Sequence, residues 1–459
     1  MMKLYNTLTR NKDEFIPMEG NTATIYSCGP TVYQYAHMGN LRTYVFMDLL
    51  RRTLKYNGYD LKHVMNITDV GHLTDDADDG EDKMAKSSRE QKKTPWEIAK
   101  FFTDVFLNDI DKLNISRPEI ISKVTDIMPE MINFVVGLGE AGYAYKTSDG
   151  IYFDVQKFED YGKLSRNNID ELRAGARVEV NDEKRHPSDF ALWKKAPKEH
   201  IMQWESPWGM GYPGWHIECS AMALKFLGER FDIHTGGVDH IPIHHENEIA
   251  QSECLLGHPA VNYWMHGEFL LVDGGKMSKS LGNTYTLDQL KEKGYDADVF
   301  RYFCLNAHYR QKLNFTFEGM DSAKTSLKNL RAALAKHKDA DGDVSVEQFK
   351  ADFDEAINDD LNIPKALGIV WTIAKYDVKS NKLYDLIMKC DDILGLDLSK
   401  PVEVEEVGSL DDEITTMIEA RTAAKKAKNF AEADRIRNEL AERGIQLIDT
   451  PEGTKWKIG

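Results

Sequence analysis

Residues 22–67 read TATIYSCGPTVYQYAHMGNLRTYVFMDLLRRTLKYNGYDLKHVMNI, and the fold class follows from their pattern. Residues 22–27 have the composition of a buried strand, which Cys28-Gly29-Pro30 ends. Residues 41–56 carry apolar side chains at four-residue spacing, which predicts a helix, and residues 61–67 predict a second strand. A strand, a loop, a helix and a strand in this order form a βαβ unit. We therefore expect a parallel sheet with a right-handed crossover.

The loop between the first strand and the helix carries polar side chains at both of its ends. Cys28 lies directly after the strand, and His37-Met38-Gly39-Asn40 precedes the predicted helix. Ligands of parallel α/β sheets bind at the carboxyl ends of the strands. The N-terminus of the helix also directs backbone N–H groups and a positive dipole end at a bound anion. These features predict a ligand site at this end of the sheet.

A second stretch, residues 214–248, is rich in metal-ligating residues: GWHIECSAMALKFLGERFDIHTGGVDHIPIHHENE. Cysteine, histidine and glutamate all bind zinc, and thiolate with imidazole favours zinc over magnesium or calcium. Residues 245–256 predict a helix, and His244 and Glu248 are four residues apart, so one helical face can direct both at a single point. His240 and His244 share that spacing. The pattern alone therefore leaves the ligands open, and it also fits an ordinary polar helix start.

The composition predicts a folded, multidomain protein. At 459 residues the chain is too long for a single core, so about two to four domains are expected. Charged residues make up 29% and hydrophobic residues 42%, which excludes wholesale disorder. The net charge of −17 argues against a nonspecific polyanion binder, although local basic patches can still bind nucleic acid. Five scattered cysteines and no signal or membrane segment predict a cytoplasmic protein without disulfides.

Two later segments carry basic side chains. Lys276-Met277-Ser278-Lys279-Ser280 is a loop whose lysines and hydroxyl groups suit phosphate oxygens, although such loops are common on protein surfaces. Residues 421–437 have a basic excess within an acidic chain. A charge run of this kind usually marks a solvated helix face.

His37-Met38-Gly39-Asn40 and Lys276-Met277-Ser278-Lys279-Ser280 resemble the HIGH and KMSKS signatures of class I aminoacyl-tRNA synthetases. Within that class the chain resembles the cysteinyl-tRNA synthetase family. The further motifs that carry this resemblance span essentially the whole chain: residues 5–10 (YNTLTR), 28–33 (CGPTVY), 66–69 (NITD), 174–178 (AGARV), 214–220 (GWHIECS), 244–248 (HHENE) and 453–456 (GTKW).

The resemblance implies an α/β fold with a Rossmann-type parallel-sheet catalytic domain. An inserted domain would split it, and an all-α helical bundle and a small C-terminal unit of helices and a hairpin would follow. The domains expected are the first catalytic half at 1–115, an inserted connective domain at 116–210, the second catalytic half at 211–265, a KMSKS-loop and stem-contact region at 266–320, a helical bundle at 321–400 and an anticodon-side domain at 410–459.

The resemblance also implies one zinc ion per chain, with Cys28, Cys219, His244 and Glu248 as ligands. His244 is thereby favoured over His240. Zinc binds a thiolate strongly and a serine hydroxyl poorly, so the metal would distinguish cysteine from serine as a substrate. The pocket for the cysteine side chain would be lined by Thr68, Trp215 and His234.

The implied reaction starts with attack of the cysteine carboxylate on the α-phosphorus of ATP, with Mg²⁺ expected and pyrophosphate released. The nucleophile is already charged, so catalysis rests on positioning and on stabilisation of phosphate charge. The residues expected to contact ATP are His37, Asn40, Lys276 and Lys279 at the phosphates and Gly236, Gly237 and Asp239 at the ribose and adenine. The cysteinyl group would then pass to the terminal ribose of tRNA(Cys).

RNA contact is expected near the C-terminus of a monomeric protein that binds no membrane. The residues expected to make it are Lys425, Lys426, Lys428, Arg435, Arg437 and Trp456.

One signature position departs from the family pattern, because Asn40 stands where a second histidine is expected. Two alternatives remain open: a cysteine ligase of mycothiol synthesis, which joins cysteine to a sugar amine, and a noncatalytic zinc-containing RNA-binding paralogue. The long helical C-terminal part argues against the first. The lysines of the KMSKS motif argue against the second.

Overall fold

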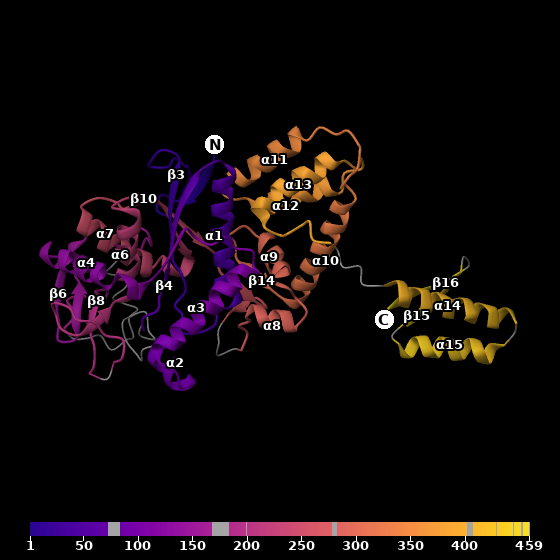
Figure 1. The fold of residues 1–459 in the computed structure, drawn as a ribbon, viewed down its shortest axis with the longest axis horizontal. Coiled ribbons are helices and arrows are strands. Elements are labelled where there is room, and N and C mark those ends of the chain that lie inside the picture. The colour runs from indigo at the N-terminus through magenta and orange to yellow at the C-terminus, as the bar shows by residue number, and fades with distance from the viewer. Residues whose placement is uncertain are drawn as a thin grey trace. The chain divides into compact units, whose positions relative to one another are not determined.

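The structure is a computed structural model that describes residues 1–71, 83–167, 183–198, 200–277, 282–401, 407–427, 429–443, 445–450 and 453–458. The chain forms two compact units, Met1–Lys400 and Pro401–Gly459 (Figure 1). Lys279, Lys428 and the motif at 174–178 lie outside the described residues, as do the side chains of Lys276 and Trp456.

The first unit is built on a parallel sheet. In the described part of the chain, this sheet has five strands in the order β11-β10-β3-β4-β5. Their bounds are β3 Thr22–Ser27, β4 Asp60–Ile67, β5 Ile120–Lys123, β10 Phe231–Gly237 and β11 Val261–Gly267. The chain runs outward from β3 in one direction and from β10 in the other, so β3 and β10 form the topological switch point where α/β sheets bind ligands. The predicted α/β class and parallel sheet are confirmed.

Helix α1, Met38–Tyr56, connects β3 to β4 and completes the βαβ unit. It begins three residues before the predicted start at Leu41 because His37 is its N-cap. The His37 ring accepts a hydrogen bond from the Asn40 N–H, and the Asn40 side chain accepts one from the His37 N–H. Histidine is not among the usual N-cap residues, so the sequence carried no ordinary start signal here.

Helices cover both faces of the sheet. Successive residues of a strand point to opposite faces, so neighbouring residues pack into different cores. Ile25 and Met65 pack into a core with α1 and α3, Pro95–Lys112. Their neighbours Tyr26 and Val64 pack into a second core. The helices of this second core are α4 Met128–Glu140, α6 Trp215–Leu227 and α7 His244–Leu256 (Figure 1).

A sheet of antiparallel strands in the order β6-β7-β8-β9 interrupts the parallel sheet between β5 and β10. Its strands are β6 Ala144–Lys146, β7 Gly150–Phe153, β8 Phe190–Lys195 and β9 Gly211–Pro213. β5 belongs to the parallel sheet, so the antiparallel segment begins only after α4. The strand β10 also includes Gly236 and Gly237.

The remaining elements of the first unit surround this framework. The strands are β1 Lys3–Asn6, β2 Asn11–Glu14, β12 Leu270–Val272, β13 Gly275–Lys276 and β14 Leu313–Phe315. The helices are α2 Lys83–Gln91, α8 Leu287–Glu292, α9 Ala297–Leu305, α10 Phe317–Ala335, α11 Glu347–Asn358, α12 Ile363–Ala374 and α13 Asn381–Leu394, with short 3₁₀ helices η1 Val124–Ile127, η2 Val155–Lys157 and η3 Val238–His240. α10 to α13 form the predicted helical bundle (Figure 1). No helix in the described ranges has both the length and the apolar character needed to cross a membrane.

The second unit contains two helices and a hairpin. Helices α14 Val407–Lys426 and α15 Phe430–Glu442 are followed by β15 Ile445–Thr450 and β16 Gly453–Ile458, which pair antiparallel. The unit has its own small core around Ile414, Ile436 and Leu440.

Candidate active site and metal-binding cluster

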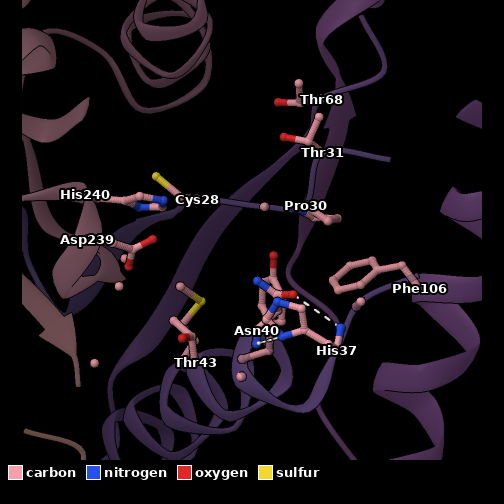
Figure 2. Close-up of a pocket in the computed structure, with 18 of the residues that line it drawn as sticks. Cys28, Pro30, Thr31, His37, Asn40, Thr43, Thr68, Phe106, Asp239 and His240 are labelled. Carbon is pink, nitrogen blue, oxygen red and sulfur yellow. Dashed lines mark hydrogen bonds between the residues drawn. The ribbon is translucent and has the colours of Figure 1, made fainter. Parts of the chain in front are cut away.

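A cavity of about 620 Å³ opens at the switch point between β3 and β10. Figure 2 shows Cys28 and His240 on one side of it and His37, Asn40 and Phe106 on the other. The sequence-predicted residues that line this cavity are Cys28, His37, Asn40, Thr68, Trp215, Cys219, Gly236, Gly237, Asp239 and His244. Segments far apart in the sequence thus meet in one cavity, whose volume is typical of sites for small ligands.

The two glycines of β10 allow the chain to come close to its neighbours here. A Cβ at Gly236 would lie 2.6 Å from His240 Nδ1, and one at Gly237 would lie 2.2 Å from Asp239 Oδ1. No larger side chain fits at either position while these neighbours stay in place. The two glycines therefore leave room for the side chains of His240 and Asp239 at the cavity wall.

Other predicted site residues lie away from the cavity wall or outside the described residues. Among the described residues, His234 and Glu248 do not line the cavity but are buried behind it. Lys276 ends β13, and the next residue, Met277, places its Cε 3.1 Å from the position of a Cβ on Gly39. Met277, which follows β13, therefore lies beside the N-terminus of α1.

Buried potential metal ligands gather next to the cavity. One ligand atom from each of Cys28, His244, His245 and Glu248 lies within 4.8 Å of the others. Three of these residues were predicted as ligands, whereas His245 was not. The fourth predicted ligand, Cys219, is also buried and hydrogen-bonds with Cys28 and His244.

The protonation of this cluster is strongly perturbed. Burial raises the pKa of Cys28 well above the usual thiol value, whereas a hydrogen bond with Cys28 lowers the pKa of Cys219 to about 7. Burial opposes protonation of His244, but the nearby Glu248 and Cys219 raise its pKa to about 10. Burial also opposes ionisation of Glu248, but His234 and His244 lower its pKa below the usual range.

The donor atoms of the cluster fit a zinc ion. Glu248 Oε2 lies 2.7 Å from His234 Nε2 and is hydrogen-bonded to it. Glu248 Oε1 is 2.9 Å from His244 Nε2 but makes no aligned hydrogen bond with any described residue, so a buried carboxylate oxygen is left for a cation. The group offers one thiol, two imidazoles and a carboxylate, and Cys219 beside it adds a second thiol. All of these donors are typical of zinc sites. Binding of the metal would displace protons from these groups.

Histidines that the sequence did not single out surround the ligands. His245 Nε2 lies 3.3 Å from Cys28 Sγ, and His245 Nδ1 lies 2.7 Å from His266 Nε2. His266 in turn contacts Thr7 Oγ1 at 2.7 Å. On the other side, His216 Nδ1 is 3.0 Å from His244 Nδ1. The repeated histidines of residues 244–245 were a signal for His245, but nothing local marked His216 or His266.

The N-terminus of α1 faces the cavity from the other side. The Asn40 N–H donates to His37 Nδ1 over 3.3 Å, which leaves the ring proton of neutral His37 on Nε2. Asn40 Oδ1 accepts from the His37 N–H over 3.2 Å, and within the described residues its NH₂ group makes no further hydrogen bond. The first turn of α1 contains no acidic residue. The helix end is therefore suited to an anion.

Comparison with known proteins identifies the class. The model of the tRNA synthetases class I (C) catalytic domain matches residues 14–325. The fold is similar to that of Mycobacterium tuberculosis methionyl-tRNA synthetase in complex with methionyl-adenylate, with a TM-score of 0.58 at 15% identity over 86% of this chain and 94% of that one. The fold and the catalytic-domain match define a class I tRNA synthetase.

Closer relatives narrow the class to one family. Cysteine–tRNA ligase from Treponema denticola is 45% identical, with 99% of each chain covered. Cysteine–tRNA ligase 1 from Burkholderia lata is 47% identical over 99% of this chain and 96% of that protein. The model of the cysteinyl-tRNA ligase anticodon binding domain matches residues 408–456. The chain belongs to the cysteinyl-tRNA ligase family.

Proposed function

We propose that this protein is a cysteine–tRNA ligase of the cytoplasm that acts as a monomer. It activates L-cysteine with ATP to cysteinyl-adenylate and pyrophosphate, and then transfers the cysteinyl group to the 3′-terminal ribose of tRNA(Cys). The observation that carries this proposal is a single cavity with a buried thiol, imidazole and carboxylate cluster on one side and an anion-binding helix N-terminus on the other.

Cysteine recognition would fall to the side of the cavity that holds the cluster. Cys28, Cys219, His244 and Glu248 would hold a zinc ion, which when bound supplies a preference for a thiolate over a hydroxyl group. The Trp215 ring lies 4.5 Å from the His244 ring and restricts the space beside it. Thr68 donates a hydrogen bond to Glu218 and accepts one from Asn66, so its side chain is fixed at the cavity wall. These side chains would orient the substrate with its carboxylate toward α1.

Activation would then be a displacement at the α-phosphorus of ATP. The cysteine carboxylate oxygen forms a bond to phosphorus, the bond to the bridging oxygen of the β-phosphate breaks, and pyrophosphate leaves with the accompanying Mg²⁺. His37 Nε2–H, the Asn40 amide and the N-terminus of α1 are placed to donate to phosphate oxygens, with Lys276 and Lys279 assigned the same task from the sequence. The Gly236-Gly237 backbone and Asp239 would contact the nucleoside.

Contact with the anticodon side of tRNA would involve α14 and α15. Lys425 and Lys426 are exposed at the end of α14. Arg435 binds both Glu432 and Glu439, and Arg437 lies 3.5 Å from Asp434. The two arginines would need to exchange these partners to bind phosphate.

Two assays on the purified protein test the proposal. Cysteine-dependent exchange of labelled pyrophosphate into ATP reports the first step, and charging of tRNA(Cys) reports the second. We expect both activities. If zinc-loaded protein shows no pyrophosphate exchange, the alternative of a noncatalytic RNA-binding protein is favoured. Exchange without tRNA charging, but with ligation of cysteine to a sugar amine, would favour a small-molecule ligase.

A further inference from the structure

Exposed aromatic side chains gather beside the mouth of the active-site cavity. Tyr35 is 49% exposed and Phe101 is 37% exposed, and their ring centroids are 6.2 Å apart. Both rings pack edge-on against the buried Phe102. Lys93 Nζ lies 4.6 Å from the centroid of the Phe101 ring. We refer to Tyr35, Lys93, Phe101 and Phe102 as the aromatic rim.

The aromatic rim is continuous with the cavity. Tyr35 and Phe102 line the cavity wall, and so does Phe106, one turn further along α3. Phe106 lies on the same side of the cavity as His37 and Asn40 in Figure 2. A run of aromatic rings thus leads from the surface at Phe101 to the end of the cavity that faces the N-terminus of α1.

The local backbone holds the aromatic rim in place. The Lys93 N–H donates to the Ser88 carbonyl oxygen over 3.1 Å, and Ser87 Oγ donates to the Tyr33 carbonyl oxygen over 2.9 Å. Thr94 and Glu97 form a capping box at the start of α3. These hydrogen bonds therefore fix three segments before any ligand binds: the loop that contains Tyr35, the turn at Lys93 and the helix that contains Phe101.

Residues 86–104, which span parts of α2 and α3, carry an excess of exposed basic side chains. The net charge of the whole chain is −17. In this segment the exposed basic residues number five, Lys86, Arg89, Lys92, Lys93 and Lys100, and the exposed acidic residues number three, Glu90, Glu97 and Asp104. Lys100 binds Asp104 and Glu97 caps α3, so both acidic groups are occupied. Lys93 instead directs its ammonium group onto the ring of Phe101.

Exposed rings beside cations suit unpaired nucleotides. Every base has a π face that can stack on an aromatic side chain, and ammonium groups bind the phosphates. We propose that the aromatic rim binds the single-stranded 3′ end of the substrate tRNA, with Tyr35 and Phe101 stacking on bases and Lys93 contacting a phosphate. This inference rests on the proposed function, in which the terminal ribose of the tRNA enters the cavity that Tyr35 and Phe102 line.

The test uses full-length protein and two forms of tRNA(Cys), one intact and one lacking its four unpaired 3′ nucleotides. Phe101→Leu keeps apolar volume but removes the π face, and Phe101→Trp restores one. We expect Phe101→Leu to weaken binding of intact tRNA about tenfold, to raise the KM for tRNA in charging, and to leave binding of the shortened tRNA unchanged. Phe101→Trp should restore binding, and pyrophosphate exchange should stay at the wild-type rate.

Charge and position are tested separately. Lys93→Gln should reduce the salt dependence of intact-tRNA binding by about 0.7 in the log–log slope, as expected for one phosphate contact on a single strand. Trp96→Leu is the control, because Trp96 is a similarly exposed aromatic residue of α3 that packs against Trp204 instead. It should leave tRNA binding unchanged.

Three results would overturn the inference while wild-type charging remains intact. The first is equal weakening of intact and shortened tRNA by Phe101→Leu. The second is unchanged binding of both, which would leave the aromatic rim to another partner such as a protein. The third is a fall in pyrophosphate exchange, which would assign the rim to the cysteine and ATP site. Absence of charging by the wild-type protein would instead contradict the proposed function itself.

Discussion

Asn40 caps the N-terminus of α1 and is also the residue that we propose as a donor to phosphate. Its Oδ1 atom completes the capping box by accepting from the His37 N–H, and its NH₂ group, at the cavity wall, has no hydrogen-bond partner in the described part of the chain. The histidine expected at this position in class I synthetases would be replaced as a donor by this amide. Capping and donation can be separated by substitution, because only the amide nitrogen donates.

Asn40→Asp should therefore keep the cap and lose the donor. We expect its free energy of unfolding to be equal to or above that of the wild type, because a carboxylate also favours a helix N-terminus. The rate of adenylate formation should fall by about 100- to 1000-fold, as for loss of one preorganised donor. Single-turnover activation and urea unfolding measure the two quantities. An unchanged rate in Asn40→Asp would restrict Asn40 to capping.

A substitution of Cys219 tests the proposal that this residue is a zinc ligand. Wild-type protein should contain one zinc ion per chain by elemental analysis, and active protein without zinc would refute the assignment. Cys219→Ser should lose at least about tenfold in zinc affinity, because a hydroxyl group replaces a thiolate ligand. Cysteine activation should fall far more than ATP binding measured by calorimetry. A parallel loss of ATP binding would indicate a general collapse of the cavity.

At the scale of the elements, a chain of buried side chains crosses the central sheet. His63 Nε2 on β4 lies 2.7 Å from Ser27 Oγ on β3, which lies 2.6 Å from Thr235 Oγ1 on β10. Two of these strands, β3 and β10, form the switch point at which the cavity opens. Burial, reinforced by the charge of Arg51, lowers the pKa of His63 from 6.5 to about 3.

This shift predicts a dependence of stability on pH. Below about pH 6.5 the unfolded chain binds a proton at His63 that the folded protein does not bind until about pH 3. Stability should therefore fall as the pH drops through this window, by up to about 1.4 kcal/mol per pH unit for this residue. His63→Gln keeps a side chain that can hydrogen-bond with Ser27 but cannot titrate. Urea unfolding between pH 7.5 and 5 gives the change of the unfolding free energy with pH for each protein. In His63→Gln this slope should be smaller than in the wild type by up to the equivalent of one proton. Equal slopes in the two proteins would contradict the prediction.

At the scale of the whole molecule, the two compact units divide the proposed reaction. The cavity and the metal cluster lie entirely within residues 1–400, and residues 401–459 have a separate core. Removal of residues 401–459 should leave cysteine-dependent pyrophosphate exchange within about twofold of the wild type, because no group that contacts cysteine or ATP is lost. Charging of tRNA(Cys) should fall strongly. Loss of exchange in a truncated protein with intact circular dichroism would show that activation needs the second unit.

Local patterns in the sequence determined the elements of this protein. The spacing of apolar residues predicted β3, α1 and β4 in their correct order, because periodicity depends only on which side of an element faces the core. The order of these elements then implied a parallel sheet and the strand ends at which Cys28 and His37 lie. The start of α1 was misplaced because a histidine served as its cap.

Only the tertiary structure decided which side chains meet. Spacing could not separate His240 from His244, but His240 lies in the 3₁₀ helix η3 and α7 begins only at His244, so only His244 shares a helical face with Glu248. His266 reaches His245 because β11 pairs with β10 in a register that sets His266 opposite Gly236. The aromatic rim likewise needs α3 packed beside the loop of Tyr35. Such contacts depend on how distant segments pack, and the periodicity of a single segment carries no record of its distant neighbours.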